Sequence, residues 1–197
     1  ELIDDSEWAA NHPNKGLIED FARIYFSRES AANMAYHTNE EWLAIYRSHC
    51  DFFMAPYEGR YALRVVNIPE ISRRGTFIQV VAKDMPFLVD SLSMALSRGR
   101  YGAQYLLTSA GFTVYRGENG EVTSVEPYSS QNQLKSSNAE AIVMIEVVYQ
   151  QSETRRAQIE AKLNETLYDV DLAVTDWKPM KEKLRSVIDR MSSGTYS

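Results

Sequence analysis

The segment from Asp84 to Ser91 carries the residues best suited to hold a small ligand. Branched and aromatic residues precede it and residues at helical spacing follow it, so a strand end should meet a helix N-terminus there. The free amides and the positive end of such a helix attract carboxylates, which makes an amino acid a natural ligand. A tight strand-to-helix turn that binds nothing explains the same pattern. The candidate ligand-binding residues are Asp84, Met85, Pro86, Phe87, Asp90 and Ser91.

The other residues capable of chemistry do not form a recognisable site. Zinc needs His or Cys ligands at close spacing, whereas the three histidines are scattered and Cys50 lies in an apolar stripe. We expect His49 at the boundary of the core with a satisfied hydrogen bond, and Cys50 to be buried. No nucleophile-elbow pattern surrounds any serine, and neither the dinucleotide fingerprint nor the P-loop occurs. This pattern predicts no catalytic residue, no metal and no cofactor in this chain.

A nucleic-acid-binding motif is the weaker alternative. Gly99-Arg100-Tyr101-Gly102 matches the loop with which KH domains clamp a nucleic-acid backbone between two helices. Here a strand-like segment follows the motif. The chain also carries 21 basic against 27 acidic residues, a net charge of −6, which disfavours a phosphate backbone as partner.

Composition indicates an ordinary globular protein, because 44% of the residues are apolar and 24% are charged. The single cysteine excludes an intrachain disulfide and fits a reducing cytoplasm. No apolar run approaches the roughly 20 residues that cross a bilayer, so we expect no membrane partner. The acidic start differs from the basic start of a signal peptide. Since residue 1 is not Met, we expect a piece of a longer protein.

The first third of the chain is predicted to be a helical hairpin. Apolar residues recur at helical spacing from Leu17 to Tyr25. The second helix begins with Thr38 and Glu41, which have the spacing of a reciprocal capping box.

The middle of the chain changes to strand periodicity. Strands are predicted at residues 61–67, 76–82, 104–116, 121–125 and 141–149, the last of them central, and the polar segment 127–138 is predicted to be a loop. A helix should follow the second strand, with Asp84 as its N-cap and Pro86 in its first turn. Ser152 is predicted to cap a further helix, and a separate final helix should begin near Asp176.

This order predicts an α+β fold of the ferredoxin-like type, with helices packed on one face of the sheet. The strand that should close such a unit is not evident after Leu167, and residues 61–67 could supply it from the other end of the chain. The expected organisation is a helical segment at 1–58, an α+β domain at 59–175 and a C-terminal helix at 176–197.

The run Asp84-Met85-Pro86-Phe87-Leu88-Val89-Asp90-Ser91 resembles the hallmark of the N-terminal region of the large bacterial NAD-dependent glutamate dehydrogenases. Arg64-Val65-Val66-Asn67 resembles the strand before the hallmark, and Phe21-Ala22-Arg23 resembles the opening helix. The resemblance continues through Val170, Ala173, Val174, Asp176, Trp177, Met180 and Leu184, so that it covers roughly residues 17 to 190.

This resemblance implies a function for the parent protein. Those enzymes oxidise L-glutamate to 2-oxoglutarate and ammonia with NAD, in a catalytic domain far downstream. Their N-terminal half carries ACT-like domains, a βαββαβ fold often used for amino-acid sensing and subunit contacts. The implied partners are downstream domains of the same polypeptide, further copies in a homo-oligomer and an amino-acid effector. Ligand-binding ACT domains have glycine where this chain has Phe87, and we expect its ring to fill the ligand space.

The sequence therefore favours a non-catalytic regulatory or assembly domain of a cytoplasmic NAD-dependent glutamate dehydrogenase. An amino-acid-sensing ACT domain that binds an effector at Asp84 to Ser91 is the alternative, and a GXXG nucleic-acid-binding module is a weaker one.

Overall fold

The computed structural model describes residues 6–71, 74–127 and 138–192. The N-terminal part holds α1 (Glu7–Ala10), α2 (Lys15–Tyr25), α3 (Ala31–Met34) and α4 (Asn39–Met54). The rest holds β1 (Tyr61–Val66), η1 (Pro69–Ile71), β2 (Gly75–Lys83), α5 (Leu88–Gly99), β3 (Ala103–Arg116), β4 (Val122–Glu126), β5 (Ala139–Val148) and α6 (Glu153–Ser192). This is the predicted α+β class. Most of the predicted loop at 127–138 lies outside the described residues.

The five strands form one sheet in the order β1-β2-β5-β3-β4, and all neighbouring strands are antiparallel. β5 is the middle strand, as predicted. Because β2 and β3 both run antiparallel to β5, they are parallel to each other, and α5 is the crossover between them. In the described residues no strand follows α6, and β1 takes the edge beside β2. Residues 61–66 thus supply the strand that the simple βαββαβ order would place last.

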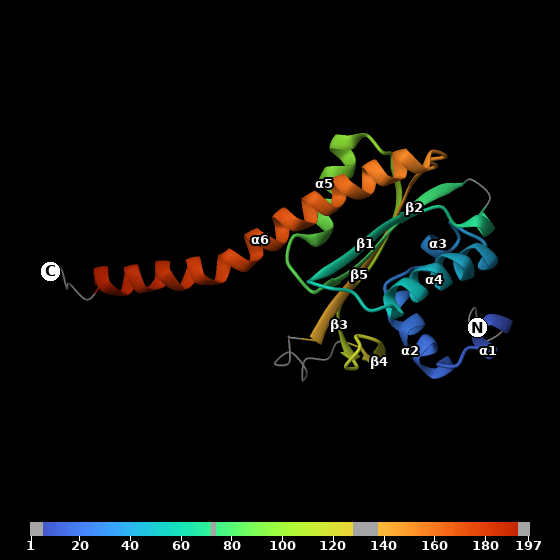
Figure 1. The fold of residues 1–197 in the computed structure, drawn as a ribbon, viewed down its shortest axis with the longest axis horizontal. Coiled ribbons are helices and arrows are strands. Elements are labelled where there is room, and N and C mark those ends of the chain that lie inside the picture. Colours follow the sequence, from blue (N-terminus) through green and yellow to red (C-terminus); the bar gives the residue numbers. More distant parts are fainter. Residues whose placement is uncertain (1–5, 72–73, 128–137, 193–197) are drawn as a thin grey trace.

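Helices cover both faces of this sheet (Figure 1). Ile78 and Val80 of β2 point to one face, against α5 and α6, while Phe77 and Val81 point to the other, against α2 and α4. This alternation buries every residue of β2 from Gly75 to Ala82. The helices that were predicted to pack on one face of the sheet correspond to α5 and α6, which share a face. The N-terminal helices form a second layer on the opposite face, a placement that helical periodicity alone does not specify.

Aromatic rings and helix caps hold this second layer together. Phe21 of α2 and Phe53 of α4 stack with ring centroids 4.1 Å apart. The predicted capping box at the start of α4 is confirmed: the Thr38 hydroxyl accepts from the Glu41 N–H, and the Glu41 carboxylate accepts from the Thr38 N–H. The Trp42 indole donates to the Met34 carbonyl at 2.7 Å, which ties α4 to α3.

α6 is one continuous helix of 40 residues, so the prediction of a separate helix from about Asp176 is wrong. The helix runs through Asp169 and Asp171 without a break, because polar residues do not by themselves end a helix. Val170 between them faces the core at 9% exposure, and Asp171 pairs with Arg60 at 2.8 Å. The first half of α6 packs on the sheet, and its last part projects beyond the body (Figure 1).

Candidate functional site

The loop between β2 and α5 contains the predicted ligand-binding residues. Asp84 is exposed, and its N–H donates to the Ala139 carbonyl at 2.9 Å, continuing the pairing of β2 with β5. Met85 is buried in the core beneath α5. α5 begins only at Leu88, with Phe87 as its N-cap residue and no side-chain cap hydrogen bond. The prediction that Asp84 caps this helix is therefore wrong, because the chain needs three more residues to turn into it.

Phe87 has an unusual conformation for its residue type. Its backbone is left-handed, with φ 67° and ψ 3°. An L-residue loses roughly 1–2 kcal/mol in this region, which glycine enters without strain. Its side chain is 66% exposed. The ring therefore lies at the surface and not in the core, and the expectation that it fills the ligand space stays a prediction.

The N-terminus of α5 leaves backbone donors without partners. The first hydrogen bond of the helix runs from the Ser91 N–H to the Phe87 carbonyl at 2.9 Å. The N–H groups of residues 88–90 have no hydrogen-bond acceptor among the described residues. Asp90 already places a carboxylate in this first turn, where it compensates the positive helix end. A carboxylate ligand would have to compete with it.

An open groove of about 570 Å³ lies between α5 and α6 next to this loop. Of the six predicted site residues only Phe87 and Ser91 line it; Asp84, Met85, Pro86 and Asp90 do not. The remaining lining is mixed, with apolar Met94, Ala95, Val170 and Ala173 and polar Arg98, Lys162, Thr166 and Asp169. The structure thus brings two of the predicted residues together on a groove with more apolar than polar surface.

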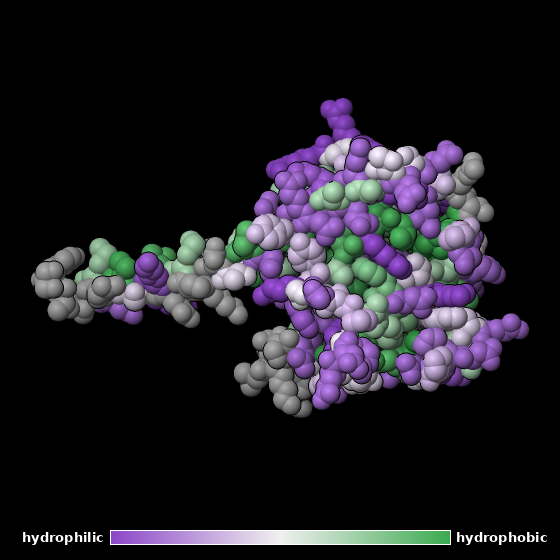
Figure 2. Space-filling model, viewed as in Figure 1, coloured by the Kyte–Doolittle hydropathy of each residue, from purple (hydrophilic) through white to green (hydrophobic). Residues whose placement is uncertain are grey.

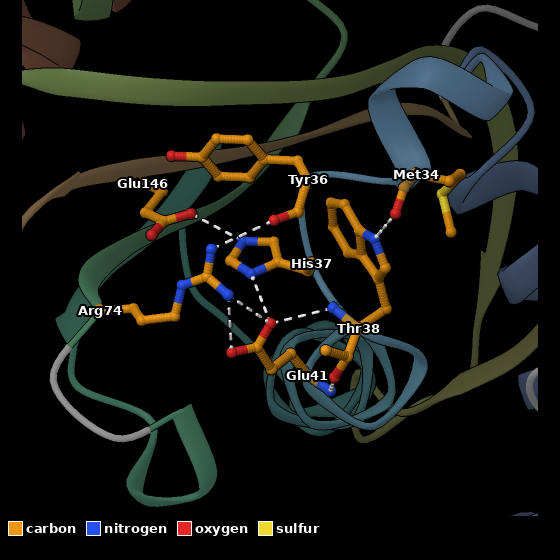
Figure 3. A network of polar contacts seen from close by, with 8 residues as sticks. Met34, Tyr36, His37, Thr38, Glu41, Arg74 and Glu146 are labelled. Atoms are coloured by element: carbon orange, nitrogen blue, oxygen red, sulfur yellow. Dashed lines mark hydrogen bonds and ion pairs between the residues drawn. The ribbon is translucent and has the colours of Figure 1, made fainter.

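A second polar cluster, not predicted from the sequence, lies on the opposite face of the sheet (Figure 3). The fully buried His37 ring lies between two carboxylates: Nε2 is 2.8 Å from Glu146 of β5, and Nδ1 is 3.3 Å from Glu41 of α4. Arg74 donates to both Glu41 oxygens at 3.0 and 2.9 Å. The His37 ring therefore joins α4 to the middle strand by polar contacts with a carboxylate on each.

The surroundings of this cluster fit a buried charged group. A Cβ on Gly75 would lie 2.3 Å from Glu146 Oε1, so glycine leaves the room that this carboxylate occupies. Burial alone would raise the pKa of Glu41, but the Thr38 N–H and the Arg74 guanidinium outweigh burial and hold it below its ordinary value. Every charged group named here is paired within the protein. The arrangement is that of a structural fastening rather than a site open to a ligand.

A similar fastening lies at the other end of β5. The fully buried Glu140 pairs with Lys83 at 2.9 Å and with Arg116 at 3.0 Å. Arg116 also donates to the carbonyls of Phe53 and Gly120. The available sequence signal was the strand alternation itself: Glu140 and Glu146 share a face with Ile142 and Met144, where a carboxylate needs a buried partner.

His49 and Cys50 lie inside the α2–α4 layer. His49 is fully buried and not at the core boundary as predicted, with the Tyr25 hydroxyl 3.1 Å from Nδ1. Burial lowers its pKa to about 3, which keeps the ring neutral. Cys50 is buried as predicted, and burial raises the pKa of its thiol to about 12. Neither group is poised for acid–base or nucleophilic chemistry near neutral pH.

The part of the chain that the structure describes holds neither a metal-ligand cluster nor a membrane-spanning helix. There, no three His, Cys, Asp or Glu side chains gather as metal ligands do. No helix in the described ranges combines the length and apolar character needed to cross a membrane. Gly99 to Gly102 joins α5 to β3, with Arg100 and Gly102 at φ 54° and 65°. This is a helix-to-strand turn, whereas the KH loop joins two helices.

Fold and site together define an α+β domain of the ACT-like class, in which a strand-to-helix loop borders an open groove. A family model described as "Glutamate dehydrogenase, ACT1 domain" matches residues 21–163. The chain therefore belongs to the glutamate dehydrogenase ACT1 domain family.

Two relatives agree with this assignment. The chain is 31% identical over 131 residues to an NAD-specific glutamate dehydrogenase of Pseudomonas aeruginosa, covering 64% of this chain and 8% of the relative. It is 27% identical over 182 residues to an enzyme of the same name from Halomonas elongata, covering 89% of this chain and 11% of the relative. The chain thus spans about a tenth of the length of these relatives. No solved structure matches it significantly.

Proposed function

We propose that this chain is a non-catalytic regulatory and assembly domain of an NAD-dependent glutamate dehydrogenase. The parent enzyme converts L-glutamate, NAD and water to 2-oxoglutarate, ammonia and NADH in domains outside residues 1–197. The observation that carries the proposal is the match of residues 21–163 to the ACT1 domain, on a fold whose buried charged groups serve to join elements. We further propose a cytoplasmic homo-oligomer, in which this domain contacts downstream domains of its own polypeptide.

An activity assay of the isolated chain tests the non-catalytic part of this proposal. The purified 197-residue chain is incubated with L-glutamate and NAD, and NADH formation is followed by absorbance. We expect a rate indistinguishable from buffer. Glutamate-dependent NADH formation that persists through repurification would overturn the proposal.

Effector binding at the β2–α5 loop is the second candidate function. The unpartnered amides of residues 88–90 and the adjacent groove favour it, while Asp90 and the strained Phe87 oppose it. Calorimetry with a panel of amino acids separates the two candidates. A saturable heat that Asp84→Ala abolishes and Glu70→Ala leaves unchanged would establish sensing. Absence of heat across the panel is what the purely architectural role predicts.

A further inference from the structure

The projecting part of α6 carries an apolar stripe without a partner in the described residues. Its members are between 40% and 62% exposed and recur at steps of three and four residues, as one face of a helix requires: Met180, Leu184, Val187 and Met191. Figure 2 shows apolar residues along this projection, outside the body of the molecule. Contiguous apolar surface of this kind marks an interaction site.

The helix face that carries the stripe leads back along α6 to the groove between α5 and α6. The α6 residues that line the groove include Thr166, Asp169 and Ala173, and the same three-and-four spacing leads from Ala173 to Met180. One helix face therefore runs from the groove to Met191. Between Ala173 and Met191 this face is about 27 Å long, or five helical turns.

Phe87 lies at the groove end of this face and supplies an independent observation. It combines a left-handed backbone with a ring that is 66% exposed, so the fold gains little packing from a residue that strains it. Such strain persists where a function maintains it. A large exposed ring beside a groove is the usual form of an anchor for a binding partner.

The charges beside the stripe indicate what covers it. Lys181 and Lys183 line its projecting part, and Arg98 lies in the groove, although the whole chain has a net charge of −6. The groove also holds Asp169, and its Lys162 is paired with Glu165 at 2.7 Å. A second copy laid stripe against stripe would bring lysines together. An acidic partner would complement them.

We propose that the groove and the projecting stripe form one docking strip for an amphipathic helix whose apolar face is flanked by carboxylates. The strip consists of Phe87, Met94, Ala173, Met180, Leu184 and Val187. The partner helix lies along α6, with its carboxylates beside Lys181 and Lys183. This inference rests on the proposed assembly function and names the chemistry of its partner.

Binding of two synthetic helices to the 197-residue chain tests the docking strip. Both labelled peptides have about 20 residues and the same Leu/Ile stripe, flanked by Glu in one and by Lys in the other. We expect fluorescence anisotropy to show binding of the Glu peptide at least about tenfold tighter than the Lys peptide, and weaker as salt is added. Lys181→Glu with Lys183→Glu should reverse the preference, whereas Arg185→Glu should retain it.

Two further variants locate the site. Leu184→Asp with Val187→Asp should abolish binding, and Phe87→Gly should weaken it without lowering the melting temperature. Equal binding of both peptides, or binding of neither, would overturn the inference. So would sedimentation equilibrium showing a dimer that Leu184→Asp with Val187→Asp dissociates, because a second copy would then occupy the strip. These outcomes leave the NADH assay unaffected, so failure of the docking strip and failure of the proposed function are distinguishable.

Discussion

At the scale of single residues, Phe87 and His37 show how this domain uses unfavourable groups. Phe87 keeps a strained backbone and an exposed ring beside a groove. His37 keeps a buried ring between two carboxylates. The first feature strains the isolated domain, whereas the second holds two of its layers together. Phe87→Gly and His37→Ala should therefore change stability in opposite directions.

Phe87→Gly should stabilise the isolated chain relative to Phe87→Ala. Alanine at this position keeps the left-handed strain, whereas glycine relieves it. Glycine also raises the entropy of the unfolded chain, but this costs less than the strain that is relieved. The free energy of unfolding should therefore be roughly 0.5–1 kcal/mol higher for the glycine variant. Urea denaturation of the two variants measures the difference. A glycine variant less stable than the alanine variant would contradict the assigned backbone conformation.

His37→Ala should destabilise the chain by roughly 1–3 kcal/mol, because it leaves the buried Glu146 carboxylate without its hydrogen-bond partner. His12→Ala is the matched control, since His12 contacts Trp8 and Asn14 and, among the described residues, no buried carboxylate. Chemical denaturation near neutral pH compares them. Equal losses in both variants would show that the cluster does not fasten α4 to β5.

At the scale of elements, α4 and α6 illustrate what local sequence specifies. The capping box at Thr38 and the apolar spacing of α2 predicted these helices correctly, because caps and periodicity act within a few residues. The central position of β5 followed from its two apolar faces. The continuity of α6 past Asp171 could not be predicted from the local sequence. The Arg60 that pairs with this carboxylate lies more than a hundred residues earlier.

The candidate site was predictable only in part, for a similar reason. The meeting of β2 with a helix N-terminus is encoded in neighbouring residues. The left-handed turn at Phe87 is not, because few residue types are less suited to it. The groove itself depends on where α6 crosses α5, and the His37 cluster depends on pairing across 109 positions of the chain. Long-range partners of this kind cannot be assigned from periodicity.

Glu41 at the start of α4 should make the folding stability depend on pH. The pKa of Glu41 is lowered in the folded state from its ordinary value of 4.5, so its contribution is present at higher pH and is lost as pH falls through the folded-state pKa. Glu41→Gln should therefore lose less stability than the unmodified chain between about pH 5 and about pH 3. Glu40→Gln, at the exposed neighbouring position, should behave like the unmodified chain in the same urea titrations.

The projecting end of α6 should contribute little to the stability of the body. Its described side chains from Met180 to Met191 are exposed, so ending the chain after Thr175 removes no core contact of theirs. We expect calorimetry to show a melting temperature within about 2 °C of the full chain. A loss of 10 °C or so would mean that this end packs on the body.

At the scale of the whole molecule, a sheet covered on both faces by helices forms a closed body from which one helix projects. The buried charges join the middle strand to the N-terminal layer, and most of the large exposed apolar residues lie along α6 and its groove. Such a body is suited to positioning a contact surface. This division between a fixed interior and one projecting surface fits the assembly or regulatory role that we propose.

A single-turnover measurement of NAD reduction by L-glutamate in the parent enzyme, with and without this domain, tests whether the domain takes part in the chemistry. We expect the chemical step to keep its rate when the domain is deleted, while the sedimentation of the enzyme or its response to effectors changes. Loss of the single-turnover rate in a deletion variant that still assembles with the same number of subunits would contradict this expectation. The domain would then supply groups to the reaction.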